Sequence, residues 1–371
     1  MRTLSQKTKR PDYIFALIIL ILSLFGIIMV ASSSMVISQE KFGSNYYFAG
    51  RQALNLLIGI ILMIVTYHID YRFWKKNAFW MFLITITLLI LVFVPGVGHK
   101  FGGAQRWIGF GPIMFQPAEI IKLTFLIYLA AWLEKKADNV KTFFTGFIPF
   151  FVLIGVIGFL IMKQPDFGTL TVIVATAAVM FFISGANIYH LCLGVGSLTV
   201  LAVILIKAAP YRLQRLLVFL NPSIDSQGAA YHINQALLAI GTGGLWGLGF
   251  GGSKQKYLYL PQVHTDSIFA IIAEEMGFIR ASLVLLMFLC IGFRGYKIAK
   301  NAPDNFSKFL SIGITSWILI QAFINLASML NLVPMTGVPL PFISFGGSSL
   351  IILLAATGIM LNISKHAGEK T

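Results

Sequence analysis

Residues 13–39 read YIFALIILILSLFGIIMVASSSMVISQ, and no side chain in this stretch carries a charge. Three more stretches without Asp, Glu, Lys or Arg run over 142–162, 167–206 and 309–364. A helix needs about 20 consecutive apolar residues to cross the hydrocarbon core of a bilayer. The sequence therefore predicts an all-α polytopic membrane protein, in which residues 1–371 form a single membrane domain.

The overall composition excludes the common classes of soluble protein. Hydrophobic residues make up 57% of the chain and charged residues 11%, whereas soluble domains carry about 25% charged residues. A water-soluble enzyme, a disordered chain and a secreted domain held by disulfides are all excluded. We also expect no nucleic acid among the partners.

Ten apolar windows lie between helix-breaking or charged segments, at 13–34, 53–68, 77–95, 117–133, 143–162, 169–184, 189–206, 268–293, 308–330 and 348–364. An even number of spans places both termini on one side. With the N-terminus inside, the inner segments hold sixteen basic and six acidic residues, and the outer segments ten and four. Because basic residues gather on the cytoplasmic side, we predict ten transmembrane helices with both termini inside. Residues 1–12 and 365–371 are then cytoplasmic tails.

The connection over 207–267, between the seventh and eighth windows, is much longer than any other, and long ordered loops are usually functional. Its stretch YRLQRLLVFL (211–220) places apolar side chains on one helical face and Arg212 and Arg215 on another, which predicts a helix in the outer membrane interface. The glycine-rich run 241–252 allows a close approach to a ligand or another backbone. It lacks the soluble βαβ unit of a nucleotide-binding loop. We expect 207–267 to be a large extracytoplasmic loop.

Basic residues on the predicted outer side exceed what simple helix connections need. Attraction to anionic lipid headgroups is one explanation. An outward-facing site for an anionic substrate is the other, because Arg and Lys neutralise phosphate oxygens. The residues concerned are Arg106, Lys163, Lys207, Arg212, Arg215, Lys254 and Lys256.

Asp266 stands at the mouth of the eighth window, two residues after His264. A carboxylate beside a histidine, with several cations in the same loop, could act as a general base. An aspartate immediately before a helix could equally serve as its N-cap. The residue types alone leave these two roles evenly balanced.

Charged residues inside predicted spans are costly and indicate function. Glu119 and Lys122 share a helix face and can pair, either as a structural ion pair or in a cavity. Asp166 lies in a turn at the outer end of the fifth or sixth window. The eighth window carries two adjacent carboxylates and an arginine whose partner must lie on another helix: Glu274, Glu275 and Arg280.

The segment NLVPMTGVPLPFISFGG (331–347) contains three prolines and a glycine pair. Such a backbone in a membrane must be buried in protein or line a water-filled cavity. We therefore expect a re-entrant segment that faces the same outer cavity as 207–267.

Five motifs, in order and over most of the chain, resemble the SEDS family (shape, elongation, division and sporulation proteins), which includes FtsW, RodA and SpoVE. They are VPGVG with GGAQRWIGFGPIMFQPAEIIKL (within 93–123), QPDFGT (164–169), YRLQRLLVFLNP (211–222), INQALLAIGTGGLWGLGFGGSKQKYLYLPQVHTDSIFAIIAEEMGF (233–278) and PMTGVPLPFISFGGSSL (334–350). Arg280 stands where the family usually has a small residue, which puts the local helix packing in doubt.

The resemblance implies a ten-helix peptidoglycan glycosyltransferase of the bacterial cytoplasmic membrane, with its active site facing outward. Its substrate would be lipid II, the undecaprenyl-pyrophosphate disaccharide peptide. Its partners would be a class B penicillin-binding protein and the division or elongation machinery. The family's essential aspartate falls on Asp266, which shifts the balance towards a general base that deprotonates the acceptor hydroxyl.

The residues that match the motifs are the expected substrate contacts: Arg106, Glu119, Lys122, Asp166, Arg212, Arg215, Gln235, Lys254, Lys256, His264, Thr265, Ser344, Gly346, Gly347 and Ser348. We expect fixed cations to stabilise the departing pyrophosphate. No cofactor and no protein metal site is evident, although a divalent cation could accompany the pyrophosphate.

Within the family, VPGVG and HTDSIFAI look closer to FtsW, the septal branch, whereas VPLPFIS leans towards RodA. We expect an FtsW-like role, with an elongation role as the alternative. A lipid II flippase is the main rival activity. It would need its cationic cavity open to the inner side, whereas the cations and Asp266 collect on the predicted outer side.

Overall fold

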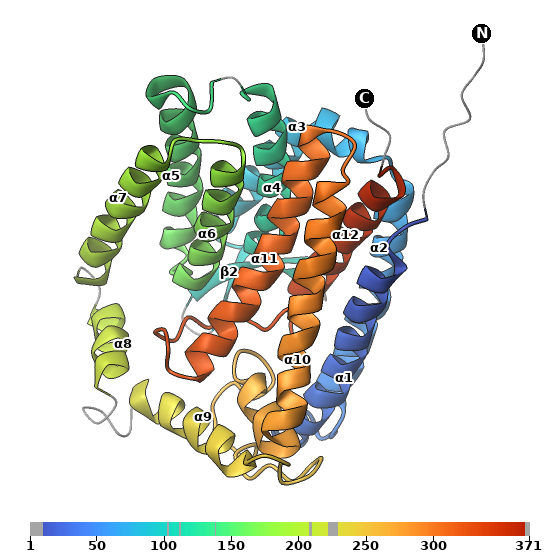
Figure 1. The fold of residues 1–371 in the computed structure, drawn as a ribbon. Helices are drawn as coiled ribbons and strands as arrows, with labels where there is room; N and C mark the ends of the chain where they lie inside the picture. The colour runs from blue at the N-terminus through green and yellow to red at the C-terminus, as the bar shows by residue number, and fades with distance from the viewer. Residues whose placement is uncertain are drawn as a thin grey trace.

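A computed structural model describes residues 10–101, 104–110, 113–137, 139–207, 210–221 and 229–367. Most of this chain is helical (Figure 1). The helices are α1 (Tyr13–Phe42), α2 (Tyr47–His68), α3 (Tyr71–Leu91), α4 (Pro117–Lys135), the π-helix η1 (Phe143–Phe147), α5 (Ile148–Lys163), α6 (Phe167–Ile183), α7 (Ile188–Lys207), α8 (Pro210–Leu220), α9 (Ala229–Gly243), α10 (Ile268–Lys300), α11 (Asn305–Met329) and α12 (Gly347–Lys365).

A helix covers most of every predicted apolar window, and the described chain contains seven helices long and apolar enough to cross a membrane. Helices α4, α6 and α7 do not meet this criterion of length and apolar composition. Helix α4 carries three charged residues before its last position (Glu119, Lys122 and Glu134), and the apolar described parts of α6 and α7 are shorter. Large apolar side chains are exposed on outer faces, such as Leu54, Leu57 and Ile61 of α2. The protein is therefore a multi-pass membrane protein.

Helix α1 begins at the same end of the bundle at which helix α12 ends (Figure 1). The backbone N–H of Asp12 donates to Ser364 Oγ at 3.0 Å. The Asp12 carboxylate caps α1 and pairs with Arg294 near the end of α10. Helix α9 and the segment 244–267 lie at the opposite end (Figure 1).

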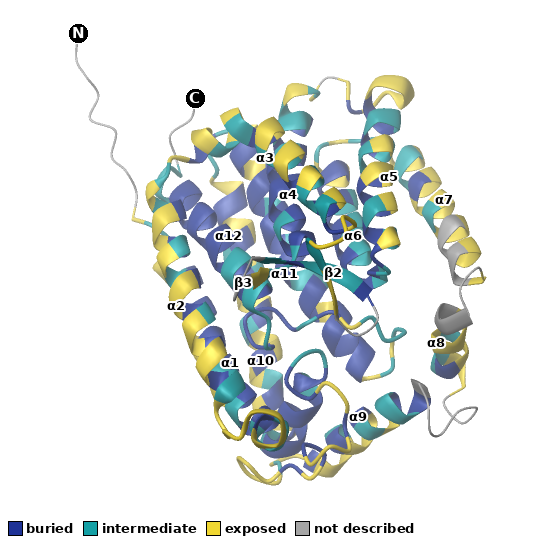
Figure 2. Cartoon of the chain, turned by 180° about the vertical axis from the view of Figure 1, so that it is seen from behind, coloured by how far each residue is buried: buried dark blue, intermediate teal, exposed yellow. Residues whose placement is uncertain are grey.

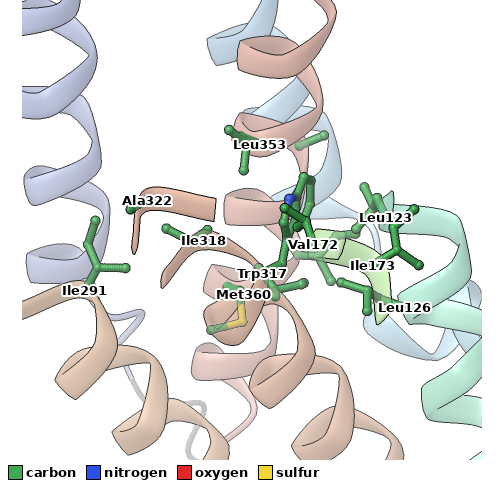
Figure 3. Packing of buried hydrophobic residues seen from close by; sticks show 14 of the residues in the cluster. Leu123, Leu126, Val172, Ile173, Ile291, Trp317, Ile318, Ala322, Leu353 and Met360 are labelled. Atoms are coloured by element: carbon green, nitrogen blue, oxygen red, sulfur yellow. The ribbon is translucent and has the colours of Figure 1, made fainter. Parts of the chain in front are cut away.

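The core lies where α4, α6, α11 and α12 meet. Trp317 of α11 is 1% exposed and packs with Leu126 of α4 and Val172 of α6 (Figure 3). In Figure 2 the buried residues fill the centre, and exposed residues lie on the outward faces of α1 and α2. A buried, charge-poor centre with an apolar exterior is the pattern of a helical membrane bundle.

A three-stranded antiparallel sheet, absent from the all-α prediction, lies between α3 and α4. Its strands are β1 (Gly98–Phe101), β2 (Ala104–Phe110) and β3 (Ile113–Phe115), in the order β1-β2-β3. A Cβ at Gly109 of β2 would come 2.7 Å from the His99 ring. The strands are too short and too glycine-rich to show a clear alternation of apolar and polar residues, so they could not be predicted from the sequence.

The connection over 207–267 contains helices and is more than a loop. The predicted helix over 211–220 is confirmed as α8, whereas α9 was not foreseen within 207–267. Residues 244–267 follow α9 without regular structure.

Helix α10 is broken inside, at Gly277, whose φ of 75° lies in the left-handed region. The glycine-rich segment fills the break. The backbone N–H groups of Leu248 and Gly249 donate to the carbonyls of Glu274 and Glu275 at 2.9 and 3.0 Å, and Phe278 N–H donates to Gly244 at 2.9 Å. The break would otherwise leave main-chain groups unpaired in the membrane, which is costly.

The segment 331–346 has no helix. Val338, Leu340, Phe342 and Ile343 are at most 5% exposed. A Cβ at Gly26 of α1 would lie 2.7 Å from Ile343 Cα, so the segment passes directly against α1.

Candidate active site

A cavity of about 250 Å³ lies beside Asp266. Among the described residues, four parts of the chain line it: α8, α9, the residue before the N-cap of α10, and the 331–346 segment. The lining residues are Arg215, Val218, His232, Ile233, Asp266, Met335 and Gly337. A Cβ built at Gly337, where φ is 70°, would lie 3.6 Å from Asp266 Oδ2. Glycine therefore allows the 331–346 segment to turn close to the carboxylate.

Asp266 does not cap α10, so the N-cap alternative is wrong. The N-cap residue is Ser267, which makes no side-chain capping bond. Asp266 Oδ1 instead accepts a hydrogen bond from Thr265 Oγ1 at 3.0 Å. Asp266 lines the cavity, with the expected contact residue Thr265 directly beside it.

Asn325 of α11 fixes the main chain at Asp266. Its Nδ2 donates to the carbonyls of Asp266 and Val338, both at 2.8 Å. One buried amide thus joins the end of the 244–267 segment to the 331–346 segment. Sequence reasoning had not singled out Asn325.

His232 of α9 shares the cavity with Asp266. Its Nε2 lies 2.6 Å from Ser267 Oγ. Burial lowers the pKa of His232, opposed by the charge of Asp266, while Arg215 lowers it further. Sequence reasoning missed His232 because it lies 34 positions before Asp266, and only the path of α9 brings the two residues together.

Burial raises the pKa of Asp266, although His232, the Thr265 hydroxyl and Arg215 oppose the rise. A carboxylate with a raised pKa is a stronger base than an ordinary one once it is ionised. Perturbed carboxylates in cavities are typical of catalytic sites.

His264 lies outside the cavity lining, against the expectation that it would accompany Asp266. Its ring packs on Phe48 at 4.4 Å and near Phe345 at 5.6 Å, and its carbonyl accepts from Phe345 N–H at 2.8 Å. Burial, helped by Lys41, lowers the pKa of His264 to about 4. His264 is therefore neutral at physiological pH and packs the segment against α2.

The Glu119–Lys122 ion pair is present, at 2.7 Å, and both side chains are buried. Lys122 Nζ also donates to Gln321 Oε1 at 3.1 Å and lies 5.2 Å from the Trp317 ring. Gln321 Nε2 in turn donates to the Pro339 carbonyl at 2.9 Å. The pair is thus linked to the 331–346 segment one helical turn from Asn325.

Asp166 caps α6, accepting from Thr169 N–H at 3.1 Å, and Gln116 Nε2 donates to it at 3.4 Å. Arg106 of β2 donates to the carbonyls of Gln164 and Pro165, at 2.9 and 2.5 Å. Both side chains therefore hold the turn before α6 and lie outside the lining of the Asp266 cavity.

The motif at the start of α12 makes similar packing contacts. Gln52 Nε2 donates to the Ser344 carbonyl at 3.0 Å, and Gln116 N–H donates to Ser348 Oγ at 3.1 Å. Gly346 is the N-cap of α12, and a Cβ at Gly347 would lie 3.0 Å from an amide atom of Asn55. These residues join α12 to α2 and α4.

Lys256 is committed to an internal ion pair, contrary to the expectation of a cation facing substrate. It is 1% exposed and binds Glu275 at 3.1 Å. Glu275 also accepts from Ser32, and Glu274 from Ser253. The two carboxylates thereby hold the glycine-rich segment in place.

The remaining residues singled out by the sequence differ in exposure and in hydrogen-bond partners. Lys254 is exposed and Gln235 of α9 is half-buried. Arg212 belongs to α8, and its side chain lies outside the described part of the structure. Arg280 donates to the Trp246 carbonyl at 3.2 Å, so its partner belongs to the 244–267 segment and is no residue of another helix.

Comparison with known proteins agrees with this architecture. A family profile described as "Cell cycle protein", of the FtsW/RodA/SpoVE type, matches residues 12–369. The stage V sporulation protein E of Bacillus subtilis is 42% identical over 98% of this chain and 100% of its own length. A probable peptidoglycan glycosyltransferase FtsW of a Geobacter species is also 42% identical, over 95% and 96%.

Two solved structures share the fold at 25% identity. One comes from work on coordinated polymerization and crosslinking by a peptidoglycan synthase complex, with a TM-score of 0.80 over 95% of this chain and 97% of the other. The second is the rod shape determining protein RodA of Thermus thermophilus, with a TM-score of 0.71 over 96% and 98%. The chain belongs to the FtsW/RodA/SpoVE family, and several of its curated relatives are named as probable peptidoglycan glycosyltransferases.

Proposed function

We propose that the protein polymerises lipid II into glycan strands at the outer face of the bacterial cytoplasmic membrane, with Asp266 as the general base. The observation that carries the proposal is the cavity in which Asp266 faces Arg215 and His232. The relatives named as peptidoglycan glycosyltransferases support the substrate class.

Glycan growth requires the hydroxyl of an acceptor sugar to attack an anomeric carbon that carries a lipid pyrophosphate. Asp266 accepts the hydroxyl proton as the new bond forms, a contribution of about 10²–10⁴-fold. Negative charge develops on the pyrophosphate, and Arg215 of the described cavity lining is a cation that can stabilise it.

The described residues give little support for a divalent cation bound by the protein itself. The described residues contain no group of three or more His, Cys, Asp or Glu side chains placed to hold a metal. The described cavity lining offers one carboxylate, whereas a calcium site held by the protein uses about six to eight oxygen ligands. No step is therefore assigned to a metal.

The topology that fits this activity has ten membrane-crossing helices, namely α1–α7 and α10–α12, with both termini in the cytoplasm. Residues 207–267 are then extracytoplasmic, and 331–347 is re-entrant from the same side. The charge distribution of the sequence supports this orientation.

We assign the protein to septal synthesis, because several relatives are named FtsW. Its partner is a class B penicillin-binding protein of the division machinery. The similarity to a chain of a peptidoglycan synthase complex supports such a partner.

The test is polymerisation of purified lipid II by the protein in liposomes with its class B penicillin-binding protein, the transpeptidase site being blocked. Wild type is compared with Asp266→Asn and with Asp70→Asn, a control at the exposed cap of α3. We expect polymer from wild type and the control, and almost none from Asp266→Asn.

Two results contradict the proposal. Equal polymer from all three proteins would remove Asp266 from the mechanism. No polymer from any of them, with lipid II crossing the liposome membrane, would favour the flippase.

A further inference from the structure

A second polar cavity lies at the opposite end of α10 from Asp266. Its volume is about 270 Å³, and it lies between the start of α1, the last turns of α10 and the end of α12. The polar residues of its lining include Arg10, Arg294, Lys297, Asn301 and Ser364. The proposed activity makes no use of this cavity.

The cavity has a surplus of positive charge. Arg294 neutralises Asp12 through two contacts, Nε to Oδ1 at 3.0 Å and Nη2 to Oδ2 at 2.6 Å. Arg10 and Lys297 then remain as two cations, for which the described residues provide no ion pair. The two contacts of Arg294 leave the N–H groups of Nη1 for a further acceptor.

An apolar groove of about 350 Å³ adjoins this cavity on the outside of the bundle, and Arg294 lines both. Ile14 and Ile18 of α1 form one wall, and Leu286, Leu289, Cys290 and Phe293 of α10 form the other. Residues 286, 289, 290, 293, 294 and 297 recur at helical spacing, so they follow one face of α10. That face changes from apolar to cationic at Arg294.

We propose that the groove between α1 and α10 binds one phospholipid with an anionic headgroup. The headgroup phosphate lies in the cavity with Arg10 and Lys297, and the first part of an acyl chain lies along Ile18 and Leu289. Arginine and lysine bind phosphate strongly, and basic pockets between membrane helices are suited to anionic headgroups.

Charge complementarity selects this occupant over others. A free phosphate would use the cavity and leave the apolar groove unexplained. A transmembrane helix of a partner would cover the groove and leave two cations without a counter-charge. A zwitterionic phospholipid would bring its own positive group towards Arg10 and Lys297. The site lies in the membrane leaflet on the side where α1 begins.

The test is native mass spectrometry of the full-length protein in mild detergent, with added phosphatidylglycerol or phosphatidylcholine. We expect one phosphatidylglycerol to be retained in preference to phosphatidylcholine. Each basic residue near a membrane surface contributes about a fivefold change in affinity, and both together about thirtyfold. Arg10→Gln with Lys297→Gln should weaken retention by that factor, and Leu289→Trp should abolish it by filling the groove.

The matched control is Lys76→Gln with Lys300→Gln, which removes two exposed cations outside the cavity lining and should leave retention unchanged. Equal retention of both lipids, or equal loss in the control, would overturn the proposal. Competition by glycerol phosphate as effective as that by the lipid would also overturn it, because the groove would then have no part. Unchanged lipid retention in Leu289→Trp would overturn it as well, because the groove would then hold no acyl chain.

Discussion

Asn325 holds Asp266 through the main chain: its side-chain amide donates to the Asp266 carbonyl at 2.8 Å from near the C-terminal end of the buried helix α11. The same amide binds the Val338 carbonyl. The position of the proposed base therefore depends on a residue that lies outside the cavity lining. Asn325 is 0% exposed, so its two hydrogen bonds are shielded from bulk water.

Replacing Asn325 with Ala should lower the rate of lipid II polymerisation by about 10²-fold, because small displacements of a catalytic group have effects of that size. The two carbonyls lose their partner, which costs about 1–3 kcal/mol of stability. Asn77→Ala, which removes an exposed side-chain bond to Phe73 on α3, is the control. Steady-state rates at saturating lipid II, together with thermal unfolding, separate the two effects; an unchanged rate in a folded Asn325→Ala protein contradicts the positioning role.

The pH dependence of polymerisation should report Asp266. Because burial raises the pKa of this carboxyl above 3.8, activity should fall as pH drops through a value higher than that of an ordinary aspartate. His232 lowers the pKa of Asp266, as do Arg215 and the Thr265 hydroxyl. His232→Gln removes a group that can become cationic at low pH, so the acidic limb should move to higher pH.

Polymerisation rates measured from pH 4 to pH 8 test whether His232 lowers the pKa of Asp266. His190→Gln on α7 is the control. A shift of the acidic limb in His232→Gln alone supports the electrostatic contact. An acidic limb in the same place for both variants would show that His232 does not act on the base.

The internal pair between Lys256 and Glu275 should dominate the stability of the glycine-rich segment. Their side chains are 1% and 0% exposed, and breaking such a pair leaves a buried charge at a cost of about 3–5 kcal/mol. We expect Lys256→Met to be that destabilising, and the double variant with Glu275→Gln to recover part of the loss. The partly exposed pair of Lys75 with Glu134 is the comparison: Lys75→Met should cost less than about 1 kcal/mol. Similar costs for the two lysines in thermal unfolding would contradict this account.

Gly277 should not tolerate a side chain. A Cβ there would lie 2.3 Å from the backbone nitrogen of Gly247, and its φ of 75° disfavours other residues. Gly277→Ala should cost about 3 kcal/mol or more, from strain and overpacking together. Gly155→Ala on α5, where nothing lies within 4 Å, should be neutral or stabilising. Thermal unfolding of the two variants measures the difference, and equal stability would mean that the break in α10 can relax.

The sequence predicted those features that depend on local pattern. Apolar windows marked the long helices, and the amphipathic stretch 211–220 marked α8. Glu119 and Lys122 pair as their three-residue spacing suggested. Each of these follows from neighbours along one helix.

The features that escaped prediction depend on contacts between distant segments. His264 stands two residues from Asp266 yet packs on Phe48 of α2, whereas His232 reaches the Asp266 cavity from α9. Lys256 was expected to face a substrate because nothing in the sequence placed it against Glu275 across the break in α10. The small sheet escaped because its strands have three to seven residues.

The most direct test of Asp266 as the general base is the single-turnover rate of lipid II polymerisation by Asp266→Asn, bound to its class B penicillin-binding protein. Asparagine keeps the shape and cannot accept the proton. The rate should fall by about 10²–10⁴-fold against wild type, with lipid II still bound. A rate within about twofold of wild type would show that another group removes the proton.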